Sequence, residues 1–158
     1  MPLDSEFLAD CPYGPEAVLL DEILEVDRDG GVVRARMDTR SDLPITRFQR
    51  VDPVRHPHHV NGGLLVHLTG MMGFVHAYYV LGLRFRDGWV GVGALINKAR
   101  YPSMAFIGKP LELMLKATNV REGKKKKVVS YDFLFTQEGN TVYKSNQTAI
   151  WIRIPTER

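Results

Sequence analysis

Apolar and polar residues alternate with a period of two over much of the second half of the chain. In 109–118 the alternating apolar residues are Leu111, Leu113, Leu115 and Ala117, and in 128–137 they are Val129, Tyr131, Phe133 and Phe135. This period is typical of half-buried strands. We therefore predict strands at 109–118, 128–137 and 141–154, with a hairpin turn at 138–140 between the last two.

The pattern before residue 109 predicts three more strands. Residues 18–27 and 32–38 form a first strand pair that turns at Gly30 and Gly31. Residues 89–101 form another strand, in which two glycines allow another group to approach the backbone closely. Residues 39–61 contain three prolines and no clear period, which indicates the kind of long irregular connection that often carries function.

One helix is predicted, from residue 62 to about residue 81. Its apolar residues fall nearly all round a helical wheel, which is typical of a helix enclosed by protein, and Gly82 is placed as its C-terminal cap. Two strands, one enclosed helix and four strands indicate an α+β fold with an antiparallel sheet wrapped around one long central helix.

Composition narrows the class of protein. A chain of 158 residues with 44% hydrophobic and 25% charged residues is predicted to form a single globular domain over 1–158. Its net charge is only +3, without a dense basic field, so we expect no nucleic-acid partner. Asn61, His67 and His76 make 60–83 costly to place in a membrane. The single Cys11 and the acidic lead favour a cytoplasmic location.

The element order, together with the sequence HHVNGG at the start of the central helix, resembles the hotdog fold of acyl-thioester enzymes, which include thioesterases and hydroxyacyl dehydratases. The resemblance in element order covers residues 12–154. In one large thioesterase group, His-Gly-Gly opens the helix and an acidic residue follows seven positions after the second glycine. Here the triplet is Asn61-Gly62-Gly63, and the position of the acid is occupied by Gly70.

Two other groups of the fold differ in their motifs. The dehydratases carry an Asp or Glu five positions after a helix-opening glycine; counted from Gly63 that position is Leu68, and 53–86 contains no acid. This disfavours a standard dehydratase. The nearest motif match is to the mycobacterial type of long-chain fatty acyl-CoA thioesterase, in which a His-aromatic-Asn triplet precedes the helix. The corresponding triplet here is His59-Val60-Asn61, and residues 98–113 also resemble that family in their residue pattern.

Thioester hydrolysis needs hydrogen-bond donors for the carbonyl oxygen and a group that activates water. Unpaired backbone N–H groups at the helix start predict an oxyanion site at Gly62, Gly63 and Leu64. Asn61 is either a second donor or only an N-cap, and the two roles are compatible. His59 is the candidate base.

Other polar residues of this region are weaker candidates for catalysis or metal binding. Thr69 either orients a water in place of the missing acid or bonds the preceding helical turn. His67 and His76 are predicted to be structural. His56, His58 and His59 lack an adjacent acid or cysteine, so no metal site is predicted.

Lys124 to Lys127 form either a solvated turn or a surface that attracts the phosphates of coenzyme A or the acidic face of an acyl carrier protein. Lys98 and Arg100 are equally available for the phosphates of coenzyme A. The resemblance implies an acyl-CoA or acyl-carrier-protein substrate from fatty acid or polyketide metabolism. It also implies no separate cofactor and at least a homodimer. We expect a thioesterase; a non-hydrolytic acyl-thioester binding protein and a dehydratase-like protein remain the alternatives.

Overall fold

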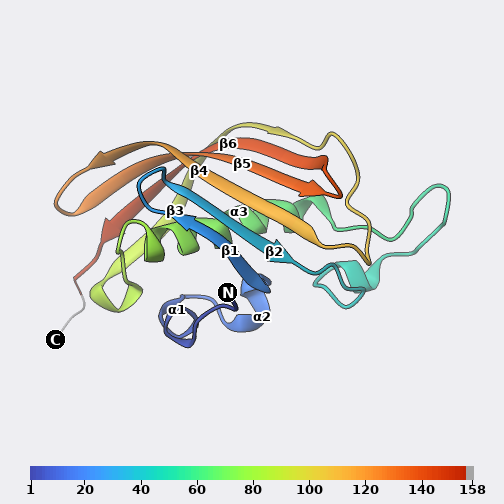
Figure 1. Ribbon diagram of the computed structural model, residues 1–158, viewed down its shortest axis with the longest axis horizontal. Helices are drawn as coiled ribbons and strands as arrows, with labels where there is room; N and C mark the ends of the chain where they lie inside the picture. Colours follow the sequence, from blue (N-terminus) through green and yellow to red (C-terminus); the bar gives the residue numbers. More distant parts are fainter. Residues whose placement is uncertain (156–158) are drawn as a thin grey trace.

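The computed structural model describes residues 1–155. Six antiparallel strands form one sheet in the order β1-β2-β4-β5-β6-β3 (Figure 1). The strands are β1 (Glu22–Asp27), β2 (Val32–Met37), β3 (Trp89–Arg100), β4 (Leu111–Glu122), β5 (Lys126–Gln137) and β6 (Asn140–Arg153). The helices are α1 (Ser5–Asp10), α2 (Pro15–Val18) and α3 (Gly62–Tyr79), with short 3-10 turns η1 (Thr46–Phe48) and η2 (Phe85–Asp87).

The predicted architecture is confirmed, and the elements that the prediction lacks lie at the N-terminus. The first strand begins at Glu22 rather than at residue 18, because Pro15 opens α2 and Leu19 then turns the chain with a φ of 62°. Neither α1 nor α2 was predicted. The residue that could have indicated the start of α1 is Asp4, an N-cap whose carboxylate accepts a hydrogen bond from the Phe7 N–H.

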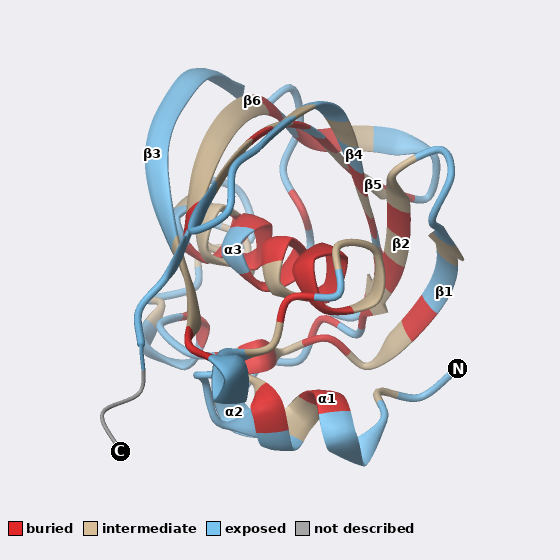
Figure 2. Cartoon of the chain, turned by 90° about the vertical axis from the view of Figure 1, so that its left-hand side faces the viewer, coloured by how far each residue is buried: buried red, intermediate tan, exposed pale blue. Residues whose placement is uncertain are grey.

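Helix α3 lies inside the curve of the sheet, as Figure 2 shows. The predicted alternation places one face of each inner strand against it, because successive side chains of a strand point to opposite faces. The buried inward residues include Leu111, Leu113 and Leu115 on β4 and Tyr131, Phe133 and Phe135 on β5. The helix and sheet therefore share one core.

The helix is less enclosed than its sequence predicts. Leu68, Met72 and Val75 are buried, but Gly63, Val66, His67, Gly70 and Phe74 form an incompletely buried stripe along α3. The spacing of three or four residues puts these positions on one face of the helix. That face borders a groove beside β3, the edge strand of the sheet.

The C-terminal end of α3 lies close to the predicted position. Its cap residue is Val80, and Gly82 follows with a φ of +67°, a conformation that glycine adopts without steric cost. No helix in residues 1–155 is both long and apolar enough to cross a membrane.

Candidate active site

The first turn of α3 has few free backbone donors. The Asn61 Oδ1 atom accepts from the Gly63 N–H at 2.8 Å, and the Asn61 carbonyl accepts from the Leu64 and Leu65 N–H groups at 3.0 and 3.2 Å. Within the described part of the chain, the Gly62 N–H has no hydrogen-bond acceptor. No acidic residue occupies the first turn to neutralise the positive end of the helix dipole.

The capping bond also orients the Asn61 side chain. Since Oδ1 is engaged by Gly63, the amide nitrogen Nδ2 is the part of the side chain left to donate to another group. Asn61 is therefore both an N-cap and a possible donor, as the sequence allowed.

The ring of His59 is oriented by the backbone just before it. Its Nδ1 lies 2.7 Å from the Pro57 carbonyl oxygen, which can only accept, so Nδ1 carries a hydrogen and the lone pair of the neutral ring is on Nε2. The Gln49 side chain fixes the His59 backbone by accepting from its N–H at 3.2 Å and donating to its carbonyl at 2.8 Å. This is the tautomer that accepts a proton at Nε2.

The loop after β3 closes over the start of α3. Tyr101 packs on Gly62 so closely that a Cβ there would lie 3.2 Å from its ring, and its hydroxyl donates to the Gly62 carbonyl at 3.3 Å. Burial, with a smaller effect of Tyr143, raises the pKa of Tyr101. Between loop and helix lies a hollow of about 290 Å³ lined by His59, Gly62, Leu65, Tyr101, Ser103 and Met104.

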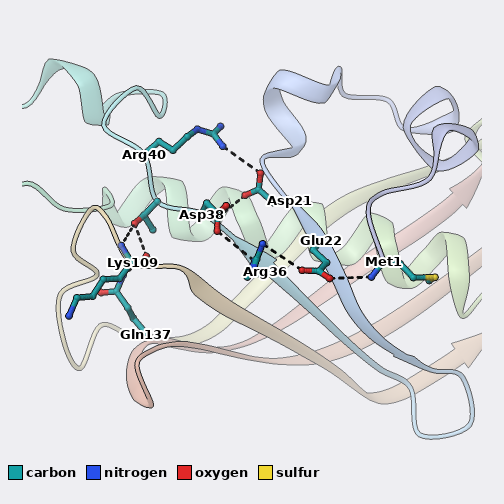
Figure 3. Close-up of polar contacts among 9 residues, drawn as sticks. Met1, Asp21, Glu22, Arg36, Asp38, Arg40, Lys109 and Gln137 are labelled. Atoms are coloured by element: carbon teal, nitrogen blue, oxygen red, sulfur yellow. Dashed lines mark hydrogen bonds and ion pairs between the residues drawn. The ribbon is translucent and has the colours of Figure 1, made fainter.

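Two buried polar side chains fix this loop from the opposite side. Gln137 accepts from the Phe106 N–H at 2.9 Å and donates to the Phe106 and Lys109 carbonyls at 2.8 Å each. The Thr39 hydroxyl donates to the Lys109 carbonyl at 2.6 Å. Figure 3 shows Gln137 and Lys109 at this junction, where the loop enters β4. The hollow therefore has a rigid wall.

The remaining histidines are bonded within the chain. Ring nitrogens of His56 and His58 contact the Arg50 and Thr46 carbonyls, and His67 Nε2 contacts the Ala17 carbonyl at 2.6 Å. His76 is fully buried, with Nδ1 3.1 Å from the Tyr131 hydroxyl, and burial lowers its pKa to about 4. One ring nitrogen of His67 and one of His76 thus contact a partner within the chain, and the structural roles of these two residues stay predictions.

Thr69 does not lie with His59 and Asn61. It is seven residues beyond Gly62, about 10 Å along the helix. Its hydroxyl donates to the Val66 carbonyl at 2.6 Å and lies 3.2 Å from Gln147 Oε1. Both side chains line the groove of about 440 Å³ between α3 and strands β3 and β6.

This groove is bordered by glycines and aromatic rings. Gly70, Gly73 and Gly93 line it, and a Cβ at any of the three would meet no atom within 4 Å. Phe74 and Trp151, packed edge to face at 5.6 Å, also line it. The groove is therefore open and largely apolar.

The predicted phosphate ligands lie on another face. Lys98 and Arg100 border a hollow on the outer side of the sheet with Lys116 and Lys144. Arg100 directly precedes Tyr101 in the chain, and Tyr101 contacts Gly62 at the start of α3. The lysine run at 124–127 lies at the other end of the sheet, where Lys126 pairs with Ile152.

Three glutamines of the site were not predicted from the sequence. Gln49 and Gln137 form hydrogen bonds with backbone groups distant in the chain, which no local pattern reveals. Gln147 has a readable signal, because it shares the inward phase of β6 with Tyr143 and Trp151 and is polar where an apolar residue is expected.

No protein-family model matches the chain, and no curated protein matches it. Solved structures resemble it at low identity. A mutant thioesterase from Pseudomonas aeruginosa is 17% identical with a TM-score of 0.63, covering 98% of this chain and 96% of that one. The PaaI protein of the E. coli phenylacetic acid degradation operon is 17% identical with a TM-score of 0.56, covering 81% and 80%.

A dehydratase heterocomplex from Xenorhabdus doucetiae is also similar, at 15% identity and a TM-score of 0.60 over 92% of this chain and 88% of that one. These likenesses, the six-stranded antiparallel sheet and the central helix agree with the predicted fold class. The chain has the hotdog fold, which these thioesterase and dehydratase structures share.

Proposed function

We propose that the protein hydrolyses acyl thioesters carried by coenzyme A or an acyl carrier protein, at the hollow beside the start of α3. The observation that carries this proposal is that a free Gly62 N–H and the His59 imidazole, with Nδ1 bonded to the Pro57 carbonyl, line the same hollow. Asn61, bonded through Oδ1, adds an amide donor. Gly63 and Leu64 shape the turn, since their N–H groups already have acceptors.

In the proposed reaction, His59 Nε2 takes a proton from water as the water oxygen attacks the thioester carbon. The carbonyl oxygen becomes negative and accepts hydrogen bonds from the Gly62 N–H and the Asn61 amide, aided by the helix dipole. The carbon–sulfur bond then breaks, and the leaving thiolate takes the proton from the His59 imidazolium. The products are a free acid and a thiol.

The groove beside β3 is the proposed site for the acyl chain. Its open glycines and apolar rings favour an unbranched hydrocarbon, consistent with the motif likeness to the mycobacterial long-chain type. Thr69 and Gln147 form its polar wall, and in one chain Thr69 is too distant from Gly62 to share a water with His59. We further propose a role in fatty acid or polyketide metabolism, in the cytoplasm.

A homodimer is also proposed. Strand β3 is an edge with one row of unpaired backbone groups, and Val92, Leu95 and Ile96 on it are about half exposed. Such an edge needs cover in a stable soluble fold. Pairing of two β3 strands would supply it.

The test uses substitutions that separate capping from catalysis. Asp caps a helix as well as Asn but cannot donate from its side chain, so Asn61→Asp should keep stability. We expect Asn61→Asp and Asn61→Ala each to lower thiol release from acyl-CoA by about 100-fold or more. His59→Gln should lower it similarly. Equal turnover in wild type and Asn61→Asp would refute the proposed donor.

One observation favours a second function. Among residues 1–155, no Asp or Glu lines either the hollow or the groove, and Gly70 occupies the position of the thioesterase acid. A non-hydrolytic acyl-thioester binding protein needs no such group, and a dehydratase-like reaction would rely on His59 alone. Thermal stabilisation by acyl-CoA without release of thiol would favour the binding protein, and conversion of hydroxyacyl to enoyl thioester would favour the dehydratase.

A further inference from the structure

The outer face of the sheet carries a cluster of cations around a hollow of about 370 Å³. Lys98 and Arg100 reach it from β3, Lys144 from β6 and Lys116 from β4, and all four are exposed. Its single acid is Asp132, which accepts a hydrogen bond from Asn146 at 2.7 Å. We call these four cations and the hollow between them the outer cationic patch.

The patch is not explained by the stability of the fold. Arg100 lies directly opposite Lys144 in the β3–β6 register, and like charges opposite one another destabilise a sheet. In the described part of the chain, none of the four cations lies within 4 Å of a carboxylate. On the same sheet, Arg34 pairs with Glu25 and Glu112. Lys116 lies opposite Asp132 in the β4–β5 register, so the four cations share one carboxylate and the patch keeps a net positive charge.

The width of the patch indicates the size of its partner. It extends from β3 across β6 and β5 to β4, which is three strand spacings or about 14 Å. A single phosphate group is much smaller than this, so a ligand that fills the patch has several anionic groups, as the face of an acidic protein does. The partly buried side chains of Met114 and Leu134 lie among the charges and offer an apolar floor. Distributed charge around apolar contacts suits the surface of an acidic protein.

The location of the patch connects it to the proposed active site. Arg100 ends β3, and the next residue, Tyr101, packs on Gly62 at the start of α3. A cofactor arm that leaves a protein bound on the patch would reach the hollow past the C-terminal end of β3, where Arg100 is followed by Tyr101. Pairing of two β3 edges would leave the outer face uncovered, so the proposed dimer is compatible with such a partner.

We propose that the outer cationic patch docks an acidic acyl carrier protein, which makes a carrier-bound acyl group the substrate. This inference rests on the proposed function for its chemistry but concerns a different surface. Complementary charge mainly raises the rate of association and is weakened by salt. The preference for carrier over coenzyme A should therefore decline as ionic strength rises.

The test compares palmitoyl groups on a purified acidic acyl carrier protein and on coenzyme A. In the double variant Lys116→Glu/Lys144→Glu, we expect kcat/KM for the carrier substrate to fall by about 10- to 100-fold at low salt. Turnover of palmitoyl-CoA should change less than about twofold. The control is Arg86→Glu, an exposed cation in η2 beside the opposite end of β3, which should leave both substrates unaffected. Unchanged thermal unfolding verifies folding.

Equal losses for both substrates, or no loss for the carrier, would overturn the proposal. If the wild type hydrolyses neither substrate, the proposed function fails and docking is measured directly by fluorescence anisotropy of labelled carrier protein. A roughly tenfold weaker Kd in the double variant alone supports docking without hydrolysis. Absence of carrier binding to the wild type, or its full displacement by free coenzyme A, overturns the docking surface.

Discussion

The open space beside Gly70 gives one prediction about stability, tested with alanine, and one about activity, tested with leucine. Gly70 lies in the interior of α3, and a Cβ added there would meet no atom within 4 Å. Alanine in a helix interior is more stable than glycine by about 1 kcal/mol. Gly70→Ala should therefore raise the free energy of unfolding by about that amount and the Tm by about 2–4 °C.

The same exchange at Gly82 is the matched control. Its φ of +67° is left-handed, so a Cβ is strained there even though space is available. Gly82→Ala should lower stability by about 1 kcal/mol. If the groove holds the acyl chain, Gly70→Leu should also reduce turnover of long acyl substrates while short ones are retained.

Urea unfolding and thiol release measure both effects. A Gly70→Ala variant that is no more stable than the wild type would show that the space is filled, and the reasoning about an open groove would be wrong. If Gly70→Leu lowered the turnover of short and long substrates equally, the acyl chain would not bind in this groove.

Three further predictions concern a buried base, the loop anchor and the edge strand. The pKa of His76 is about 4 folded against 6.5 unfolded, so its contribution to stability is complete above pH 6.5 and declines by about 3 kcal/mol as pH falls to 4. The free energy of unfolding of His76→Gln should lack this part of the pH dependence. The same pH dependence in the variant and in the wild type would contradict the prediction. Gln137→Leu should cost about 2–4 kcal/mol in urea unfolding because Phe106 and Lys109 lose buried partners, and a cost near zero would refute the anchor. Leu95→Glu should yield a monomer by light scattering, whereas a wild-type monomer would refute the proposed dimer.

Most of the fold could be predicted from the sequence because the sheet buries only one face. Burial of one face produces a two-residue period of apolar residues in β4 and β5. The enclosed helix produces a mostly apolar stretch that begins at residue 64. The N-terminal helices were missed because α1 and α2 are short and lie against α3 through a few side chains such as Phe7, which do not form a periodic pattern.

The candidate site was predictable in part. The sequence NGG indicated a helix start with Asn61 as cap, since capping is local. It did not reveal that Asn61 takes the Gly63 N–H and leaves Gly62 free, because that depends on side-chain geometry. The tautomer of His59 depends on its contact with the Pro57 carbonyl. The loop that forms one wall of the hollow depends on Gln137, which lies 31 residues beyond Phe106 in the chain.

The separation of Thr69 from His59 has the same origin. Spacing along one helix fixes how far apart two residues lie, but the loop before the helix can place His59 in many positions. Lys98 and Arg100 were predicted as a pair for a phosphate, whereas the strand register adds Lys116 and Lys144 from distant segments. Pairing between strands, rather than any local motif, creates the outer cationic patch.

The central claim is that a thioester carbonyl binds at the start of α3. The most direct measurement is a crystal structure with a non-hydrolysable acyl-CoA analogue in which a methylene replaces the sulfur next to the carbonyl. We predict its carbonyl oxygen about 3 Å from the Gly62 N–H nitrogen and within reach of the Asn61 amide, with the acyl chain in the groove beside Gly70. A carbonyl bound elsewhere, with the Gly62 N–H unengaged, would contradict this account.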